Sequence, residues 1–240
     1  MLEIGKVLDT NAQLVCRRLG ESKIMASSFY LAGGTTLALQ LGHRRSLDLD
    51  FFQKGDAERI SFNRIARELK HLFGESRFKI SLKQIDQAVW NIAGTKVTFL
   101  AYPFPLLYPL VEGATISPVL AGISLAGPRE IAAMKAYALG RRATFRDYVD
   151  LYFLLRNGHV TLGEIIRDAG RKFVVAGKAV FSAKLFLEQL NYTADVDDKE
   201  VTLNLMSDGK LTSAEIQDFF REQVRSFLES ETTQQRGDLP

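Results

Sequence analysis

The stretch that most constrains the fold is residues 31–52, which read LAGGTTLALQLGHRRSLDLDFF. It begins with a Gly-Gly-Thr turn, continues through a short apolar segment of helical pattern, and ends in an apolar run that contains Asp48 and Asp50. Side chains alternate faces along a strand, so these two carboxylates are expected to project to one side, where they could share a metal ion. The glycines let the backbone approach a ligand closely, and the helix start that follows favours an anion. The pattern therefore predicts a phosphate site that faces a divalent-metal site.

Each half of this pattern also has a purely structural explanation. Two glycines before a helix often form only a tight turn, and an Asp-x-Asp pair often lies on the solvated face of a strand. Here Leu47, Leu49, Phe51 and Phe52 make the strand core-like, and charges in such a strand are unfavourable unless they are paired or metal-bound. The combination is more specific than either half.

The composition limits the classes of protein to consider. The chain has 240 residues, of which 46% are hydrophobic and 25% charged, as expected for a globular protein with one large or two small cores. The formal net charge of +3 does not by itself indicate a nucleic-acid-binding protein. The single cysteine, Cys16, excludes an internal disulfide and fits a reducing compartment. Neither a signal peptide nor a run of ~20 apolar residues is evident, so we expect a cytoplasmic protein with no membrane partner.

Hydrophobic periodicity predicts a mixed first half and a helical second half. In the first half we expect helices over 5–23, 35–41 and 61–73, and strands over 28–32, 47–52, 78–82, 88–92, 96–100 and 123–125. The three strands between residues 78 and 100 are expected to pair antiparallel, next to the strand of Asp48. In the second half we expect helices over 128–142, 144–157, 162–173, 176–190 and 213–228. The sequence therefore predicts an α+β fold, with an α/β domain over 1–127, a helical domain over 128–230 and a flexible tail over 231–240.

A second group of charged residues lies in an apolar setting between residues 129 and 155. Lys135 is surrounded by alanines, Ile131 and Met134, so its ammonium group must reach a partner or water. Asp147 and Asp150 are three residues apart and share a face of a predicted helix. The simplest explanation is that Lys135 or a nearby arginine, Arg146, pairs with Asp147 and joins two helices.

Together the two stretches resemble the nucleotidyltransferases of the AbiEii/AbiGii toxin family, a branch of the DNA polymerase β-like superfamily. The first signature is Gly-Gly-Thr, a helix, and then His-Arg-x-Ser-x-Asp-Leu-Asp-Phe-Phe. The second is Ala-Met-Lys followed by Arg-x-x-x-Arg-Asp-x-x-Asp-Leu. The resemblance implies a polymerase β-like mixed sheet with flanking helices, followed by a helical C-terminal half.

The resemblance also implies roles for individual residues. Asp48 and Asp50 would bind magnesium, or manganese, and would form the catalytic set together with Lys135 and Asp147. The nucleoside triphosphate would be bound by Gly33, Gly34, Thr35, Arg44, Ser46 and Lys135.

By the same resemblance, the protein would transfer a nucleotide to an RNA acceptor such as a tRNA 3′ end. It would be the toxin of a toxin–antitoxin or phage-defence system, with a cognate antitoxin as a partner. Basic side chains could hold the phosphate backbone of the RNA, or could simply form solvated helix faces. The candidates in and near the two signatures are Arg44, Arg45, Arg141, Arg142 and Arg146, and those on the later helices are Arg171, Lys172, Lys178 and Lys184.

One departure from the superfamily concerns a third carboxylate. Polymerase β-like enzymes commonly present this carboxylate from a strand next to the Asp-x-Asp strand, but the candidate strand here carries Thr98. Asp86 is less suitable as a replacement, because it lies before the neighbouring strand and not within it. Asp147 could supply the missing charge from the helical half. The departure keeps open an alternative, a non-catalytic nucleotide-binding module that retains a degenerate nucleotidyltransferase fold.

Overall fold

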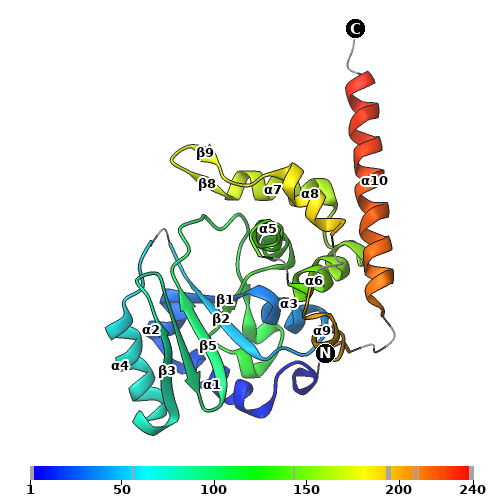
Figure 1. Cartoon of the computed structure of the whole chain (residues 1–240). Coiled ribbons are helices and arrows are strands. Elements are labelled where there is room, and N and C mark those ends of the chain that lie inside the picture. Colours follow the sequence, from blue (N-terminus) through cyan, green and yellow to red (C-terminus); the bar gives the residue numbers. More distant parts are fainter. Residues whose placement is uncertain are drawn as a thin grey trace. The chain divides into compact units, whose positions relative to one another are not determined.

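The computed structural model describes residues 3–55, 57–142, 144–192, 196–207, 209 and 211–237. The chain divides into two compact units, Met1–Gly127 and Pro128–Pro240. The first unit contains a large sheet with flanking helices, and the second is mainly helical (Figure 1).

The first unit is built on a seven-stranded mixed sheet in the order β3-β4-β5-β2-β1-β7-β6. The strands are β1 (Phe29–Ala32), β2 (Asp48–Gln53), β3 (Phe78–Lys83), β4 (Gln87–Ile92), β5 (Thr95–Leu100), β6 (Val111–Glu112) and β7 (Ser124–Leu125). The expected antiparallel pairing of β3, β4 and β5 is confirmed. β5 then pairs with β2 in parallel. This is possible because the chain between them, which contains α4, β3 and β4, crosses back so that β5 starts at the same edge of the sheet as β2.

Four α-helices flank this sheet: α1 (Thr10–Glu21), α2 (Lys23–Ser28), α3 (Gly33–Leu41) and α4 (Phe62–Phe73). Short 3₁₀ helices cover Ile4–Lys6, Glu75–Arg77, Gly113–Thr115 and Pro118–Leu120. The single helix predicted over 5–23 was wrong at both ends. The Asp9 side chain accepts a hydrogen bond from the Ala12 amide and starts α1, whereas Ser22 caps a separate helix, α2, through the Met25 amide.

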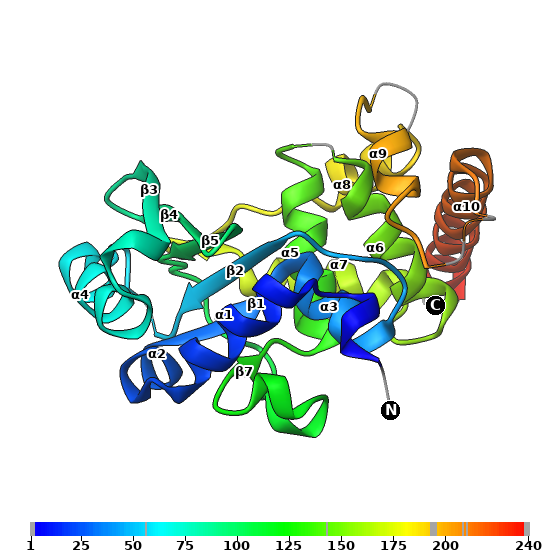
Figure 2. The same cartoon turned by 90° about the horizontal axis from the view of Figure 1, so that it is seen from below.

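The core of the first unit lies on one face of the sheet. Leu49 and Phe51 of β2 point to this face, next to Val97 and Phe99 of β5, and they pack with buried side chains of α1 and α4. Figure 2 shows α1 and α2 next to each other beside β1 and β2. Because strand side chains alternate, Asp48 and Asp50 point to the opposite face.

The second unit contains α5 (Pro128–Leu139), α6 (Phe145–Arg156), α7 (Leu162–Lys172), α8 (Ala183–Leu190), α9 (Lys199–Leu203) and α10 (Ser213–Gly237). The helix predicted over 176–190 starts only at Ala183, because β8 (Val174–Val175) and β9 (Lys178–Ala179) form a hairpin. Its turn residues Ala176 and Gly177 have φ of 48° and 76°, which an α-helix does not allow. α9 was not predicted, and α10 continues past the predicted end at residue 228 to Gly237.

Candidate functional site

The two acidic residues of β2 occupy one face of the central sheet. Asp48 and Asp50 alternate with the buried Leu49 and Phe51, and both aspartates are half-buried. On the neighbouring strand β5, Lys96 is in register with Asp48 and Thr98 is in register with Asp50. The predicted common face of the two carboxylates is therefore confirmed.

The glycine turn lies directly against this acidic pair. β1 ends at Ala32, which is in register with Asp50, and α3 begins at the next residue, Gly33. Gly33 has φ of +74°, and a Cβ atom at this position would lie 3.4 Å from Asp50 Oδ2. The N-cap residue of α3 is Ala32, whose side chain makes no capping hydrogen bond. A helix start, whose first N–H groups favour anions, thus lies beside a carboxylate that can bind a cation.

Two hydroxyl side chains connect α3 to the start of β2. The Thr35 hydroxyl donates a hydrogen bond to the carbonyl oxygen of Asp48, and its Oγ1 lies 2.6 Å from Ser46 Oγ. Arg44 is 2% exposed and donates a hydrogen bond of 3.0 Å to the carbonyl oxygen of Arg45. The interactions of Thr35 and Ser46 hold the turn and the acidic strand together, and the nucleotide-binding roles of Thr35, Ser46 and Arg44 stay predictions.

A lysine that the sequence analysis did not single out lies at this site. Lys96 Nζ is 3.2 Å from Asp48 Oδ2, and the Lys96 side chain is 56% exposed. Thr98 lies beside Asp50, as expected for the strand that lacks the third carboxylate. Within the described ranges, no group of three or more His, Cys, Asp or Glu side chains is arranged to hold a metal ion.

The donor set nevertheless fits magnesium. Magnesium commonly takes one or two protein carboxylates and completes its coordination with substrate phosphates and water. Asp48 and Asp50 supply two hard oxygen ligands on one face, next to a helix start suited to phosphate. The pair can therefore hold a magnesium ion that is shared with a bound phosphate group.

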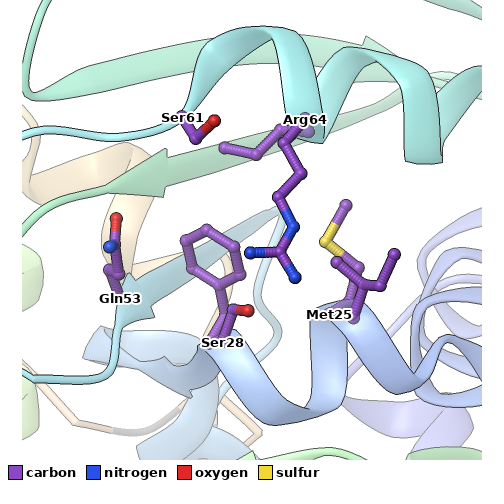
Figure 3. Close-up of a pocket in the computed structure, with 8 residues that line it drawn as sticks. Met25, Ser28, Gln53, Ser61 and Arg64 are labelled. Carbon is purple, nitrogen blue, oxygen red and sulfur yellow. The ribbon is translucent and has the colours of Figure 1, made fainter.

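A small cavity of about 50 Å³ lies at the other end of β2 (Figure 3). Gln53, the last residue of β2, lines it together with side chains of α2 and of the start of α4. Figure 3 shows the Arg64 guanidinium reaching from α4 toward Ser28 and Met25 of α2. None of the residues that line the cavity is acidic, so it offers no carboxylate ligand to a metal ion.

In the second unit, Lys135 forms a buried ion-pair cluster. Its Nζ lies 2.6 Å from Asp147 Oδ1 and 2.7 Å from Asp150 Oδ2, and Thr144 donates a hydrogen bond of 2.9 Å to Asp147 Oδ2. Lys135 is 7% exposed, and both aspartates are more deeply buried. The expected link between two helices is thus made by Lys135, which joins α5 to α6, and Asp150 is a second partner that the sequence did not indicate.

A second buried ion pair joins α5 to α7. Lys172 Nζ lies 2.6 Å from Glu130 Oε1, and both side chains are at most 1% exposed. Burial lowers the pKa of Lys172, and the Glu130 carboxylate opposes this shift. Lys172 was among the candidate RNA contacts, and its burial shows that this prediction was wrong. The pairing itself could not be predicted, because Glu130 and Lys172 lie far apart in the chain. The pair joins two helices inside the second unit and has no assigned role in the chemistry.

No helix in the described part of the chain is long and apolar enough to cross a membrane.

Comparisons with known proteins show the family to which the chain belongs. The family described as "Nucleotidyl transferase AbiEii toxin, Type IV TA system" matches residues 21–236. The chain is 30% identical over 206 residues to the uncharacterised protein aq_aa25 of Aquifex aeolicus, covering 86% of this chain and 91% of that one.

Two solved structures share the fold. A presumed nucleotidyltransferase of H. pylori has a TM-score of 0.50 at 18% identity, over 92% of this chain and 95% of that one. The nucleotidyltransferase toxin MenT4 of Mycobacterium tuberculosis has a TM-score of 0.51 at 13% identity, over 90% and 88%. Because the family match spans most of the sequence, the chain belongs to the AbiEii family of toxin nucleotidyltransferases.

Proposed function

We propose that this protein transfers a nucleotide from a nucleoside triphosphate to an RNA acceptor, such as the 3′ end of a tRNA, in a magnesium-dependent reaction. The toxin family supports the reaction class and an antitoxin partner. The observation that carries the proposal is the position of the Asp48–Asp50 pair against the N-terminus of α3.

In the proposed reaction, an acceptor hydroxyl attacks the α-phosphorus, a new P–O bond forms, and pyrophosphate leaves. Such transfer depends on positioning and charge neutralisation more than on covalent help from the protein. Magnesium, when bound, would neutralise charge on the phosphate oxygens. Asp48 and Asp50 supply its protein ligands, and the first N–H groups of α3, at Gly33 and Gly34, bind phosphate oxygens.

We assign the Lys135 ammonium to the triphosphate, on the basis of the second family signature. A lysine is a compact point charge suited to polyphosphate oxygens. Within the second unit, Asp147 and Asp150 hold this ammonium in one place, and Thr144 fixes Asp147. Asp147 therefore acts as a positioning residue for Lys135 in this proposal.

Thr98 favours one competing function. A threonine hydroxyl cannot replace a carboxylate as a base for the acceptor hydroxyl, so a nucleotide-binding protein without turnover is the second candidate.

One experiment separates the two candidates. The full chain is incubated with labelled nucleoside triphosphates, magnesium and total tRNA, with EDTA-treated samples as the control. Labelled RNA that appears only with the metal supports the transferase. Tight nucleotide binding without incorporation supports the non-catalytic alternative.

The RNA acceptor can be tested separately by measuring how tRNA binding depends on the salt concentration. If arginines such as Arg45, Arg141 and Arg142 contact the phosphate backbone, tRNA binding will weaken steeply as salt is added, because bound counterions are released on binding. Binding that is insensitive to salt would remove this part of the proposal.

A further inference from the structure

The strand next to the acidic pair contributes a positive charge to the metal site. In the parallel register of β2 and β5, Lys96 stands beside Asp48, where its Nζ is 3.2 Å from Asp48 Oδ2. The contact joins an exposed lysine to a carboxylate whose side chain is 27% exposed. The ammonium is therefore able to move away from Asp48 without breaking buried packing.

The charges on this face favour an electrostatic role. Asp48 and Asp50 contribute two negative charges and Lys96 one positive charge, while Thr98 adds none. A divalent cation that binds Asp48 meets an ammonium already in contact with the same carboxylate. The two cations compete for Asp48 and repel each other at short range.

We infer that Lys96 is a built-in competitor for the divalent cation at Asp48, and that it lowers the affinity of the two-carboxylate site for the free metal ion. This inference rests on the proposed metal site at Asp48 and Asp50. The site would then retain a metal ion poorly until a triphosphate adds its own oxygen ligands.

The inference predicts a gain of metal affinity when the lysine charge is removed. Lys96→Met should bind Mn²⁺ alone roughly five- to tenfold more tightly than the wild-type chain, as Coulomb's law predicts for charges a few Å apart near water. Lys96→Arg keeps the charge and should bind Mn²⁺ as weakly as the wild type. Since the Lys96 side chain is 56% exposed, both variants should fold.

The measurement is a Mn²⁺ titration of the full chain, followed by electron paramagnetic resonance in the absence of nucleotide. Lys79→Met is the matched control, because Lys79 is an exposed lysine of β3 in register with the uncharged Asn91. This control removes the same net charge at a distance from Asp48. It should leave Mn²⁺ affinity unchanged, which separates a local effect from one of net charge.

Two different failures can be distinguished. If Asp48→Asn loses Mn²⁺ binding while Lys96→Met binds no more tightly than the wild type, the competitor role is wrong and the metal site survives. If Asp48→Asn and Asp50→Asn both bind Mn²⁺ like the wild type, the metal site itself is wrong. An equal gain in Lys79→Met and Lys96→Met would also overturn the inference.

Discussion

Each unit contains two aspartates close to a lysine, but Lys96 contacts one of them, Asp48, whereas Lys135 contacts both Asp147 and Asp150, and the two clusters differ in burial. In the first unit the side chains of Asp48 and Lys96 are 27% and 56% exposed. In the second unit those of Lys135, Asp147 and Asp150 are 9%, 3% and 0% exposed. Similar charges are therefore partly exposed to water in one cluster and buried in the protein interior in the other.

This difference predicts different consequences of mutation. An ion pair near water contributes little to stability, so Asp48 can exchange Lys96 for a ligand at small cost. A buried pair has already lost its hydration, and removal of one partner leaves an inadequately compensated charge. Substitutions in the first cluster should therefore act on activity, and those in the second on the free energy of unfolding as well.

The largest effect is expected for Asp48→Ala. Loss of a metal ligand should lower nucleotide incorporation by roughly 10⁴-fold, which corresponds to several kcal/mol of transition-state stabilisation. The free energy of unfolding should change by less than ~1 kcal/mol, because the side chain is partly exposed. Incorporation of labelled nucleotide and urea unfolding measure the two quantities, with Asp218→Ala as the control, because the Asp218 side chain is 73% exposed. Full activity of Asp48→Ala would end the case for the metal site.

The second prediction concerns Lys135→Met. The change removes the ammonium shared by Asp147 and Asp150, and should lower the free energy of unfolding by ~3–5 kcal/mol. The control is Lys184→Met, because the Lys184 side chain is 86% exposed, and its loss should change stability by less than ~0.5 kcal/mol. Urea unfolding of both variants tests the contrast. Equal stability of the two would mean that burial does not distinguish the clusters.

A combined variant separates stability from function at Lys135. When Asp147→Asn and Asp150→Asn accompany Lys135→Met, the uncompensated charge disappears and part of the lost stability should return. If incorporation stays lost in this variant although stability returns, the result supports a role for the Lys135–Asp147 pair in the reaction. Recovery of activity would show that Lys135 has only a structural role.

Local sequence signals predicted the parts of the fold that depend on neighbouring residues. The Gly-Gly-Thr turn, α3 and the acidic strand β2 follow from residue spacing along one short stretch. The hairpin β8–β9 was missed, although Val174, Val175 and Gly177 favour strands and a turn, because its strands of two residues are too short to show an alternating pattern. Its turn also uses Ala176 at positive φ, a conformation that alanine rarely adopts.

At the site, too, only the features that depend on neighbouring residues could be predicted. The common face of Asp48 and Asp50 follows from strand alternation alone. The contact of Lys96 with Asp48 depends on the register between β2 and β5, which lie far apart in the chain. The sequence predicted that either Lys135 or Arg146 pairs with Asp147. The second contact of Lys135, with Asp150, could not be predicted, because it depends on how α5 packs on α6.

Gly33→Ala is expected to lower stability by less than Lys135→Met does, and it tests whether the backbone conformation of the turn matters for activity. Alanine at a φ of +74° should cost ~1–2 kcal/mol of stability, and its Cβ would lie 3.4 Å from Asp50 Oδ2. Gly55→Ala is a matched control, with a φ of +85° and no atom within 4 Å of the added Cβ. Both variants should lose similar stability in urea unfolding, but only Gly33→Ala should lose activity. Equal activity in the two would show that the turn does not contribute to the site.

The smallest effect is expected for Tyr148→Phe, which tests the burial of Tyr148 in the second unit through the pH dependence of stability. The Tyr148 hydroxyl lies 2.9 Å from the carbonyl oxygen of Gln189, and burial, followed by the negative charge of Asp147, raises the pKa of Tyr148 to about 12. A raised pKa stabilises the folded state below about pH 10, and this contribution is lost as the pH rises toward 12. Tyr148→Phe should therefore lower the free energy of unfolding by ~1 kcal/mol at pH 7, because the hydrogen bond is lost. Between pH 9 and 11 the wild type should lose ~1 kcal/mol as Tyr148 ionises, and the variant should not show this loss. Urea unfolding at these three pH values measures both effects, with Tyr192→Phe as control, because the Tyr192 side chain is largely exposed. Parallel loss of stability in the wild type and Tyr148→Phe between pH 9 and 11 would contradict the raised pKa, and with it the water-poor environment that distinguishes this cluster from the one at Asp48.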